Sequence, residues 1–293
     1  ILNNGDKFYE GYFKHLSELK FLKYDYIYRT KSLTKEKSLA IDISEFKVYH
    51  NLISLFKSYG TVVGFFYRNN FKKELNLIEV YLDNLNIELI LKSVQKISEE
   101  RYFIILVYYK MYLALRFNDS SKNYLEFKNL LTEKDKCFHV NEKRILYNFL
   151  ETALTVNSEI NASGRDYFEI DRLRSEKGIL IDSKNNISFN EFTNIVKTAS
   201  SLKEISFIEN FVKTNHIYIP ATVREYAVNY SMAYLYNLKK DYDKSIEMIN
   251  SFLMDNYECK VDLKTLQIRN YFEKSDFVTI GFLIDSFKHY LTS

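Results

Sequence analysis

The side chains best suited to hold a metal ion or to act as nucleophiles are widely spaced in this sequence. Its two cysteines, Cys137 and Cys259, lie far apart along the chain. A structural zinc site draws on Cys and His ligands paired at short, regular spacing, and Cys137 and His139 are too close together for such a pair. No two histidines lie four residues apart on one helical face; they are His15, His50, His139, His216 and His289. We therefore expect reduced, buried thiols and no metal site.

One loop resembles a calcium-binding loop in part of its pattern. Asp182 and Asn186 stand at the first and fifth positions of a twelve-residue calcium loop. The sixth position is Ile187 where a glycine makes the sharp turn, and the twelfth is Thr193 where a glutamate supplies two oxygens. The sequence predicts instead a capping box at Ser188–Glu191, which begins a helix running toward residue 200.

Motifs for enzymatic chemistry are missing from the sequence. It contains no G-x-S-x-G nucleophile elbow, no phosphate-binding loop and no dinucleotide fingerprint. Acidic pairs such as Glu99 with Glu100 are flanked by basic residues in amphipathic segments, a pattern typical of solvated helix faces. We expect no catalytic residues and no cofactor, and hence a protein that is not an enzyme.

The composition favours a helical protein with a sizeable core. The 293 residues include one proline and seven glycines, too few for the turns of a many-stranded sheet protein. Hydrophobic residues make up 46% of the chain and charged residues 27%, values typical of globular domains. The most apolar run, residues 102–117, is interrupted by Lys110 and is shorter than the ~20 residues that cross a bilayer. It predicts a central buried helix and no membrane span.

The charge pattern argues against a dedicated nucleic-acid surface. Lys and Arg number 41 against 38 Asp and Glu, and the two signs alternate along the chain. The basic cluster Arg29–Lys37 could contact phosphates, although Glu36 interrupts it. The 25 tyrosines and 23 phenylalanines fit an aromatic core better than a stacking platform. Nucleic acid is therefore an unfavoured partner.

Apolar residues recur at helical spacing along nearly all of the chain. Expected helices cover a segment that ends at the turn Asn69–Asn70, a next segment with Leu75, Ile78, Leu82 and Leu85, and then residues 101–117, 122–131, 141–158, 166–176 and 188–200. Gly60 and Gly64 fall inside the first of these, where close helix packing or a kink would explain them.

Three regions are predicted. Residues 1–160 form an N-terminal block of helical hairpins, residues 161–187 a loop-rich connection, and residues 188–293 C-terminal helical repeats. The localisation expected from the thiols is cytoplasmic. Since the chain begins at Ile1 without a methionine, a preceding leader stays open.

The C-terminal part contains one pattern written twice. The stretch 239–252 is matched by 274–287 at an offset of 35 residues. Large residues align with large ones, and polar residues recur as well: Tyr236 with Tyr271, Asp241 with Asp276, Tyr242 with Phe277, Met248 with Leu283, Ile249 with Ile284, Ser251 with Ser286 and Phe252 with Phe287.

The first copy resembles a tetratricopeptide repeat, a helix-turn-helix unit of 34 residues. The matching positions are Ala233, Tyr236, Tyr242, Ser245, Ile249 and Phe252. The copy departs from the family at the hallmark Trp, which is Asn229, and at the turn Gly, which is Lys240. Residues 201–211 are a candidate for the second helix of a third, decayed copy of the unit. The ending of the last copy is also similar to bacterial repeat proteins, which implies no activity.

This resemblance implies a right-handed α-solenoid of antiparallel helical hairpins, because one hairpin cannot bury both sides of its apolar stripe alone. It also implies a concave groove lined by the first helix of each unit. Carried over position by position, the groove residues are Tyr230, Tyr234, Asn237, Thr265, Arg269 and Phe272.

The expected function is that of a non-catalytic scaffold or adaptor that binds a protein or peptide in this groove. The alternatives are a helical-repeat nucleic-acid-binding protein and an enzyme with no recognisable motif. The identity of the partner and the oligomeric state stay open.

Overall fold

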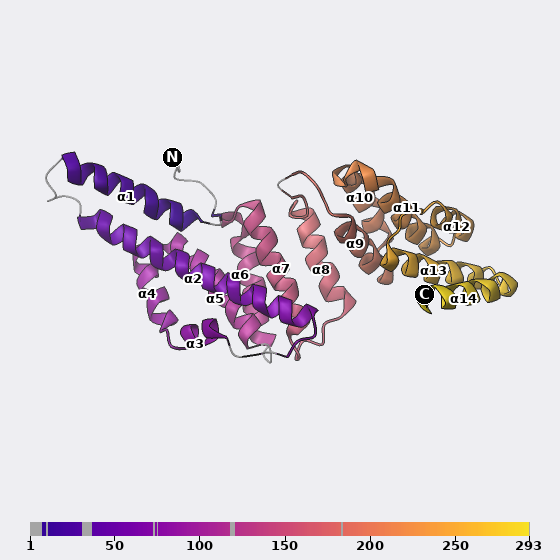
Figure 1. Cartoon of the computed structure of the whole chain (residues 1–293), viewed down its shortest axis with the longest axis horizontal. Coiled ribbons are helices and arrows are strands. Elements are labelled where there is room, and N and C mark those ends of the chain that lie inside the picture. The colour runs from indigo at the N-terminus through magenta and orange to yellow at the C-terminus, as the bar shows by residue number, and fades with distance from the viewer. Residues whose placement is uncertain are drawn as a thin grey trace. The chain divides into compact units, whose positions relative to one another are not determined.

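The computed structural model describes residues 8–9, 11–30, 37–72, 74, 76–117, 121–182 and 184–292. Within these residues every regular element is a helix, apart from one isolated bridge between Phe8 and Phe138 (Figure 1). The prediction of an all-α protein is confirmed. The chain divides into two compact units, Ile1–Ala162 and Ser163–Ser293.

The N-terminal unit is built around its fifth helix. Its elements are α1 (Tyr12–Thr30), α2 (Lys37–Arg68), α3 (Leu77–Asp83), α4 (Ile87–Ile97), α5 (Glu99–Arg116), α6 (Ser121–Lys134), the short 3₁₀ helix η2 (Asp135–Cys137) and α7 (Val140–Val156). Helix α5 contacts α2, α4, α6 and α7. The prediction of a central buried helix is confirmed, because eight of its side chains are buried: Ile104, Ile105, Val107, Tyr108, Met111, Tyr112, Ala114 and Leu115.

Side-chain caps set where three of these helices begin. Asn76, Asn86 and Ser98 each accept a hydrogen bond from the backbone N–H three residues later, at 3.1, 3.0 and 3.3 Å. The first N–H groups of a helix have no partner within the helix, so each cap satisfies one of them.

Close helix packing explains one of the two glycines of α2. A Cβ at Gly60 would lie 2.6 Å from Cε1 of Phe149 on α7. At Gly64 the nearest atom would be Cγ2 of Thr152 at 3.7 Å, an ordinary contact. The packing prediction is therefore confirmed for Gly60, whereas Gly64 is under no comparable constraint.

The C-terminal unit contains α8 (Gly164–Glu176), α9 (Phe189–Ser201), α10 (Ile205–Asn215), η3 (His216–Tyr218), α11 (Ala221–Leu238), α12 (Tyr242–Asn250), α13 (Tyr257–Glu273) and α14 (Phe277–Thr292). Helix α11 contacts α9, α10, α12 and α13. Helix α8 occupies much of residues 161–187, the region expected to be a loop-rich connection. The two copies of the doubled stretch contain the turn and helix α12 and the turn and the start of α14. Together with the helices before them they form two consecutive helical pairs, α11 with α12 and α13 with α14.

The turn inside each helical pair has the same backbone conformation. Lys203 between α9 and α10, Lys240 between α11 and α12, and Ser275 between α13 and α14 all have positive φ, at 59°, 63° and 58°. In each turn, the residue that follows the positive-φ residue donates its N–H to the carbonyl five positions earlier. The three donors are Glu204, Asp241 and Asp276. A left-handed residue that follows a helix end closes it in this way, and glycine is the usual choice.

Two of the helices that follow these turns, α12 and α14, are capped in the same manner, whereas α10 has no side-chain cap. Asp241 accepts a hydrogen bond from the N–H of Lys244, and Asp276 accepts one from the N–H of Thr279 at 3.1 Å. Ser188 accepts one from the N–H of Glu191 at 3.2 Å, as the predicted helix start requires. The Glu191 carboxylate pairs with Arg174 of α8.

A continuous apolar cluster, here called the seam, joins α9 to α13. Ala233 and Ser245 are fully buried where α11 meets α12, while Ile249 and Phe252 are each 8% exposed. Their counterparts in the last pair are more open, since Ile284 on α14 is 38% exposed. The seam contains Phe192, Val196, Ile208, Phe211, Tyr230, Ala233, Ile249, Phe252, Leu263 and Leu266.

Substitution of the two glycines of α2 by alanine should have different effects. Gly60→Ala should lower the free energy of unfolding by about 1–2 kcal/mol, because the Phe149 ring must move. Gly64→Ala should leave it unchanged or raise it by up to about 1 kcal/mol, because alanine is the better helix former. Urea unfolding followed by circular dichroism measures both, and equal effects would contradict the packing at Gly60.

Glycine at the left-handed turn position should stabilise the C-terminal unit. Lys240→Gly should raise the free energy of unfolding by about 0.5–1 kcal/mol, because a side chain with positive φ is strained. The control Lys239→Gly should lower it, because Lys239 has φ of −80° in the right-handed region. Thermal melting of the two variants checks this, and a loss of stability in Lys240→Gly would be inconsistent with the turn.

Candidate functional site

Three helices that are not consecutive along the chain together line a pair of pockets in the C-terminal unit. Helix α11 lies against α9 and against α13. One pocket has a volume of about 240 Å³ and is lined by Lys197, Ser200, Ser201, Tyr234, Asn237, Leu238, Asp262, Thr265, Leu266 and Arg269. Four predicted groove residues thus lie together: Tyr234, Asn237, Thr265 and Arg269.

The second pocket adjoins the first. It has a volume of about 400 Å³ and is lined by Asn190, Thr193, Asn194, Lys197, Tyr230, Tyr257, Glu258, Cys259, Val261 and Asp262. Both pockets share Lys197 and Asp262, whose ion pair has Nζ–Oδ1 and Nζ–Oδ2 distances of 2.7 and 2.8 Å. We call the two pockets together the groove; this ion pair lies where they meet.

Tyr230 belongs to the floor of the groove. Its side chain is 1% exposed, and its hydroxyl donates to Oδ2 of Asp262 at 3.1 Å. Burial raises the pKa of Tyr230 far above its ordinary value, and burial raises the pKa of Tyr234 to about 12. Both phenols therefore stay neutral at physiological pH and act as hydrogen-bonding surfaces, with ring centroids 5.1 Å apart.

A buried chain of hydrogen bonds holds Asn237 in place. Its Nδ2 donates to Oδ1 of Asn270 at 2.7 Å, and Nδ2 of Asn270 donates to Oγ of Ser245 at 2.8 Å. The Ser245 hydroxyl donates in turn to the carbonyl of Ala233 at 2.7 Å. Asn270 and Ser245 are both fully buried, so this chain ties α11, α12 and α13 together beneath the groove.

One predicted residue does not line the groove. Phe272 is 60% exposed, and its ring packs edge-on against Phe277 with a centroid distance of 6.0 Å. It follows Arg269 by three residues on α13, but neither pocket includes it.

The contribution of α9 was missed in the sequence. Asn190, Asn194, Lys197 and Ser201 line the groove at helical spacings of four, three and four residues. The polar residues of the predicted helix 188–200 recur at helical spacing, and this pattern could have indicated a binding face. The prediction did not pair this helix with residues 201–211 as the first helix of a repeat, so it assigned no function to that face.

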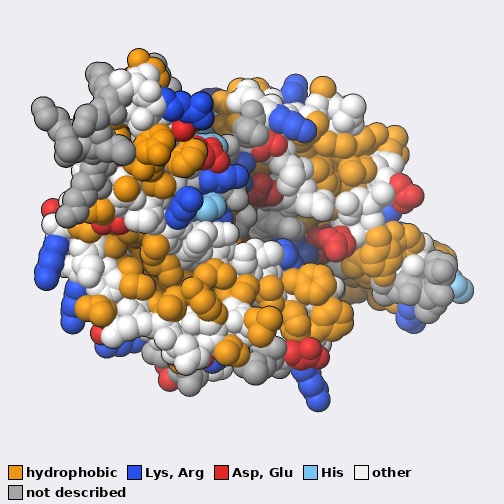
Figure 2. Space-filling model, turned by 60° about the vertical axis from the view of Figure 1, so that its left-hand side comes forward, with side chains coloured by type: hydrophobic (Ala, Val, Ile, Leu, Met, Phe, Trp, Pro, Cys, Tyr) orange, Lys and Arg blue, Asp and Glu red, His pale blue; other side chains and the backbone are white. Residues whose placement is uncertain are grey.

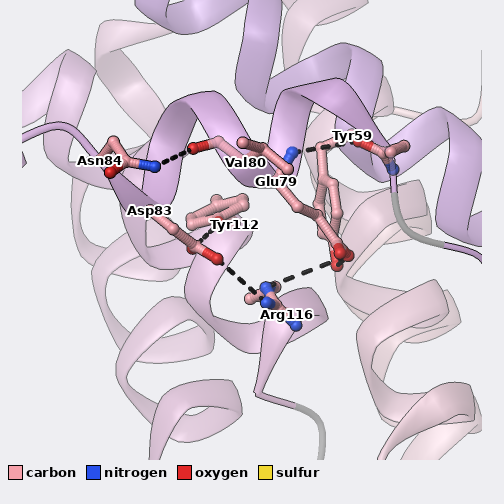
Figure 3. A network of polar contacts seen from close by, with 8 residues as sticks. Tyr59, Glu79, Val80, Asp83, Asn84, Tyr112 and Arg116 are labelled. Atoms are coloured by element: carbon pink, nitrogen blue, oxygen red, sulfur yellow. Dashed lines mark hydrogen bonds and ion pairs between the residues drawn. The ribbon is translucent and has the colours of Figure 1, made fainter.

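The N-terminal unit contains a polar cluster shared by α2, α3 and α5 (Figure 3). The Tyr59 hydroxyl donates to Oε1 of Glu79 at 2.8 Å, and Tyr112 donates to Oδ1 of Asp83 at 3.2 Å. Arg116 lies between the two carboxylates, with Nη2 3.1 Å from Asp83 and Nε 4.0 Å from Glu79.

The protonation states in this cluster favour a structural role, in which it connects α2, α3 and α5. Burial and then the hydrogen bond to Glu79 raise the pKa of Tyr59 well above its ordinary value, and burial raises the pKa of Tyr112 to about 12. Burial lowers the pKa of Arg116, but the hydrogen bond to Asp83 and the charge of Glu79 outweigh it, so that pKa is raised. A charged guanidinium between two acidic side chains, with neutral phenols, crosslinks the helices.

A second buried carboxylate ties α2 and α5 to α7. Glu142 is 1% exposed, lies 3.0 Å from Nζ of Lys57, and accepts a hydrogen bond from the Tyr108 hydroxyl. It borders a pocket of about 200 Å³ that also includes His50. A buried carboxylate is costly without partners, and the two present here satisfy it.

The remaining expectations on chemistry concern thiols, ions and membranes. Both cysteines are free thiols, as expected; Cys259 is buried, as expected, whereas Cys137 is only half-buried. Burial, with Asp262 and Glu258 nearby, raises the pKa of Cys259 to about 11. The Asp182 carboxylate accepts N–H bonds from Lys184 and Asn186, both at 2.8 Å, and so stabilises its own loop. In the described part of the chain no helix is long and apolar enough to cross a membrane.

In comparisons with known proteins, the chain matches no family model, no curated protein and no solved structure.

Removal of the buried amide at the base of the groove should destabilise the C-terminal unit. Asn270→Ala should lower the free energy of unfolding by about 1–3 kcal/mol, because it leaves Ser245 and Asn237 short of a partner and opens a cavity. Asn250→Ala is the control, since Asn250 is exposed and its side chain accepts a hydrogen bond from Gln267 at 3.3 Å; its effect should stay within about 0.5 kcal/mol. Denaturant unfolding of both variants tests the chain of hydrogen bonds. Equal free energies of unfolding for Asn270→Ala and Asn250→Ala would contradict it.

Proposed function

We propose that this protein is a non-catalytic scaffold that binds an extended peptide segment of a partner protein in the groove between α9, α11 and α13. The observation that carries the proposal is the convergence of Tyr234, Asn237, Thr265 and Arg269 in one pocket that adjoins a second. Aromatic rings offer contact area at small entropic cost, and amide and hydroxyl side chains satisfy the backbone of a bound peptide.

The proposal includes a tetratricopeptide-like, right-handed stack for the C-terminal unit. Its support is the shared left-handed turn of the three helical pairs, the contacts of α11 with both α9 and α13, and the seam. Helices α9, α11 and α13 take the place of the first helix in each pair. Helical hairpins in the N-terminal unit would extend this plan, and two free thiols fit a reducing cytoplasm.

The shape and polarity of the groove favour a peptide over a small molecule. Small-molecule sites are mostly apolar and enclose their ligand. Here eleven polar or ionic side chains line the two open pockets: Asn190, Thr193, Asn194, Lys197, Ser200, Ser201, Asn237, Glu258, Asp262, Thr265 and Arg269.

The charge distribution favours a protein partner over nucleic acid. On the face shown in Figure 2, Lys and Arg side chains are interspersed with acidic and apolar ones. The groove itself holds Lys197 and Arg269 against Asp262 and Glu258. Phosphate backbones are bound by patches of one sign, with a steep loss of affinity as salt rises. Residues 31–36 of the basic cluster lie outside the described residues.

The groove is tested with a display library of random peptides selected on the full chain. Tyr234→Ala combined with Arg269→Ala should weaken the binding of the selected peptides about tenfold or more, because truncation of an anchor residue costs more than about 1 kcal/mol of binding free energy. The helical circular-dichroism signal should not change.

The control for this experiment is Phe272→Ala, which removes an exposed aromatic ring from the same helix outside the groove. It should leave the affinity within about twofold. An equal loss in both variants, or unchanged affinity in the double variant, would refute the groove. Retention on RNA or DNA that disappears at moderate salt would instead support the nucleic-acid alternative.

A further inference from the structure

The groove carries one unpaired charge of each sign, in different pockets. Glu258 lines only the pocket of about 400 Å³, and Arg269 lines only the pocket of about 240 Å³. Lys197 and Asp262 neutralise each other where the pockets meet. No ion pair within the described residues involves Glu258 or Arg269, in contrast to Lys260, which is tied to Asp255 at 2.7 Å.

The helix geometry places these two charges on the same side of α13. They are separated by eleven residues, about three turns at 3.6 residues per turn, so their directions differ by only about 20°. Along the helix axis they are about 16 Å apart at 1.5 Å per residue. Asp262 and Thr265 stand between them on the same stripe.

We infer that the groove selects an internal peptide segment with a basic side chain at the Glu258 end and an acidic side chain at the Arg269 end. An extended chain advances about 3.3 Å per residue, so 16 Å corresponds to about five residues. This inference rests on the proposed peptide-binding function and adds to it the charge order that the partner must carry. Between the two charges the segment is uncharged, because the Lys197–Asp262 pair offers no net charge.

The contribution of each charge is modest and falls at high salt. Exposed ion pairs at the rim of an interface change affinity by about two- to fivefold each, mainly as specificity. At about 1 M salt, charges are screened over a few ångströms, so most of the preference for oppositely charged side chains should disappear.

The probe is a library of peptides of about nine residues, acetylated and amidated, whose second and seventh positions are Lys, Glu or Gln. The other positions are drawn from Ala, Ser, Tyr and Leu. Fluorescence polarisation with the full chain should show peptides with one Lys and one Glu binding about four- to 25-fold tighter than the Gln-Gln peptides, because both ion pairs form, and also tighter than Lys-Lys or Glu-Glu peptides.

Two charge reversals make the test specific. Glu258→Lys should move the preference to Glu-Glu peptides, and Arg269→Glu should move it to Lys-Lys peptides, with unchanged circular dichroism in both. Glu258→Gln and Arg269→Gln are milder variants that should each remove one half of the preference without reversing it.

The outcomes separate this inference from the proposed function. Binding of all peptides with equal affinity, unaffected by either reversal, would overturn the charge order while leaving a peptide-binding groove. Failure of every peptide to bind would overturn both. Tighter binding of a Gln peptide after its amidated end is replaced by a free carboxylate would show that Arg269 reads a chain terminus, and would overturn the choice of an internal segment.

Discussion

The C-terminal unit depends on one constraint, the need to cover α11 on several sides at once. Its buried residues, Ala227, Tyr230, Ser231, Ala233 and Leu235, point in different directions around the helix. A helix of this kind is stable only when neighbours remove each of those sides from water. Helices α9, α10, α12 and α13 do so, and the seam is the result.

The groove follows from the same constraint. Because α9 and α13 both pack against α11, their outward faces lie beside one another and leave pockets of about 400 and 240 Å³ between them. The Lys197–Asp262 pair and the Asn237–Asn270 bond then connect neighbouring helices at this surface. Lys197, Asp262 and Asn237 are thus held by the contacts that stabilise the fold, which lowers the entropic cost of binding through them.

Sequence reasoning predicted the class of the fold and five of the residues that line the two pockets, for identifiable physical reasons. Helical periodicity marked the buried helix α5, and the doubled stretch marked α12 and α14 because the same cap and turn recur in both. Helices α1 and α4 were not assigned. The turn at Lys240 was noted as a departure from glycine, although its backbone retains the left-handed conformation that glycine normally supplies.

The remaining features depend on contacts that one sequence does not reveal. Asn270 looks like an ordinary polar helix residue, yet it is fully buried and bonded to both α11 and α12. Phe272 satisfied the spacing of a groove residue, but its ring packs against Phe277 instead. The polar cluster around Arg116 joins residues from three helices, and no sequence pattern brings Glu79 and Asp83 together with Arg116.

The most direct test of the groove is site-specific photo-crosslinking on the full chain. A photoreactive amino acid placed at Thr265, which is exposed and lines the groove, should crosslink to a selected peptide, while the same group at Phe272 should not. Mass spectrometry of the product would locate the attachment. Crosslinks formed at Phe272 and absent at Thr265 would contradict the account.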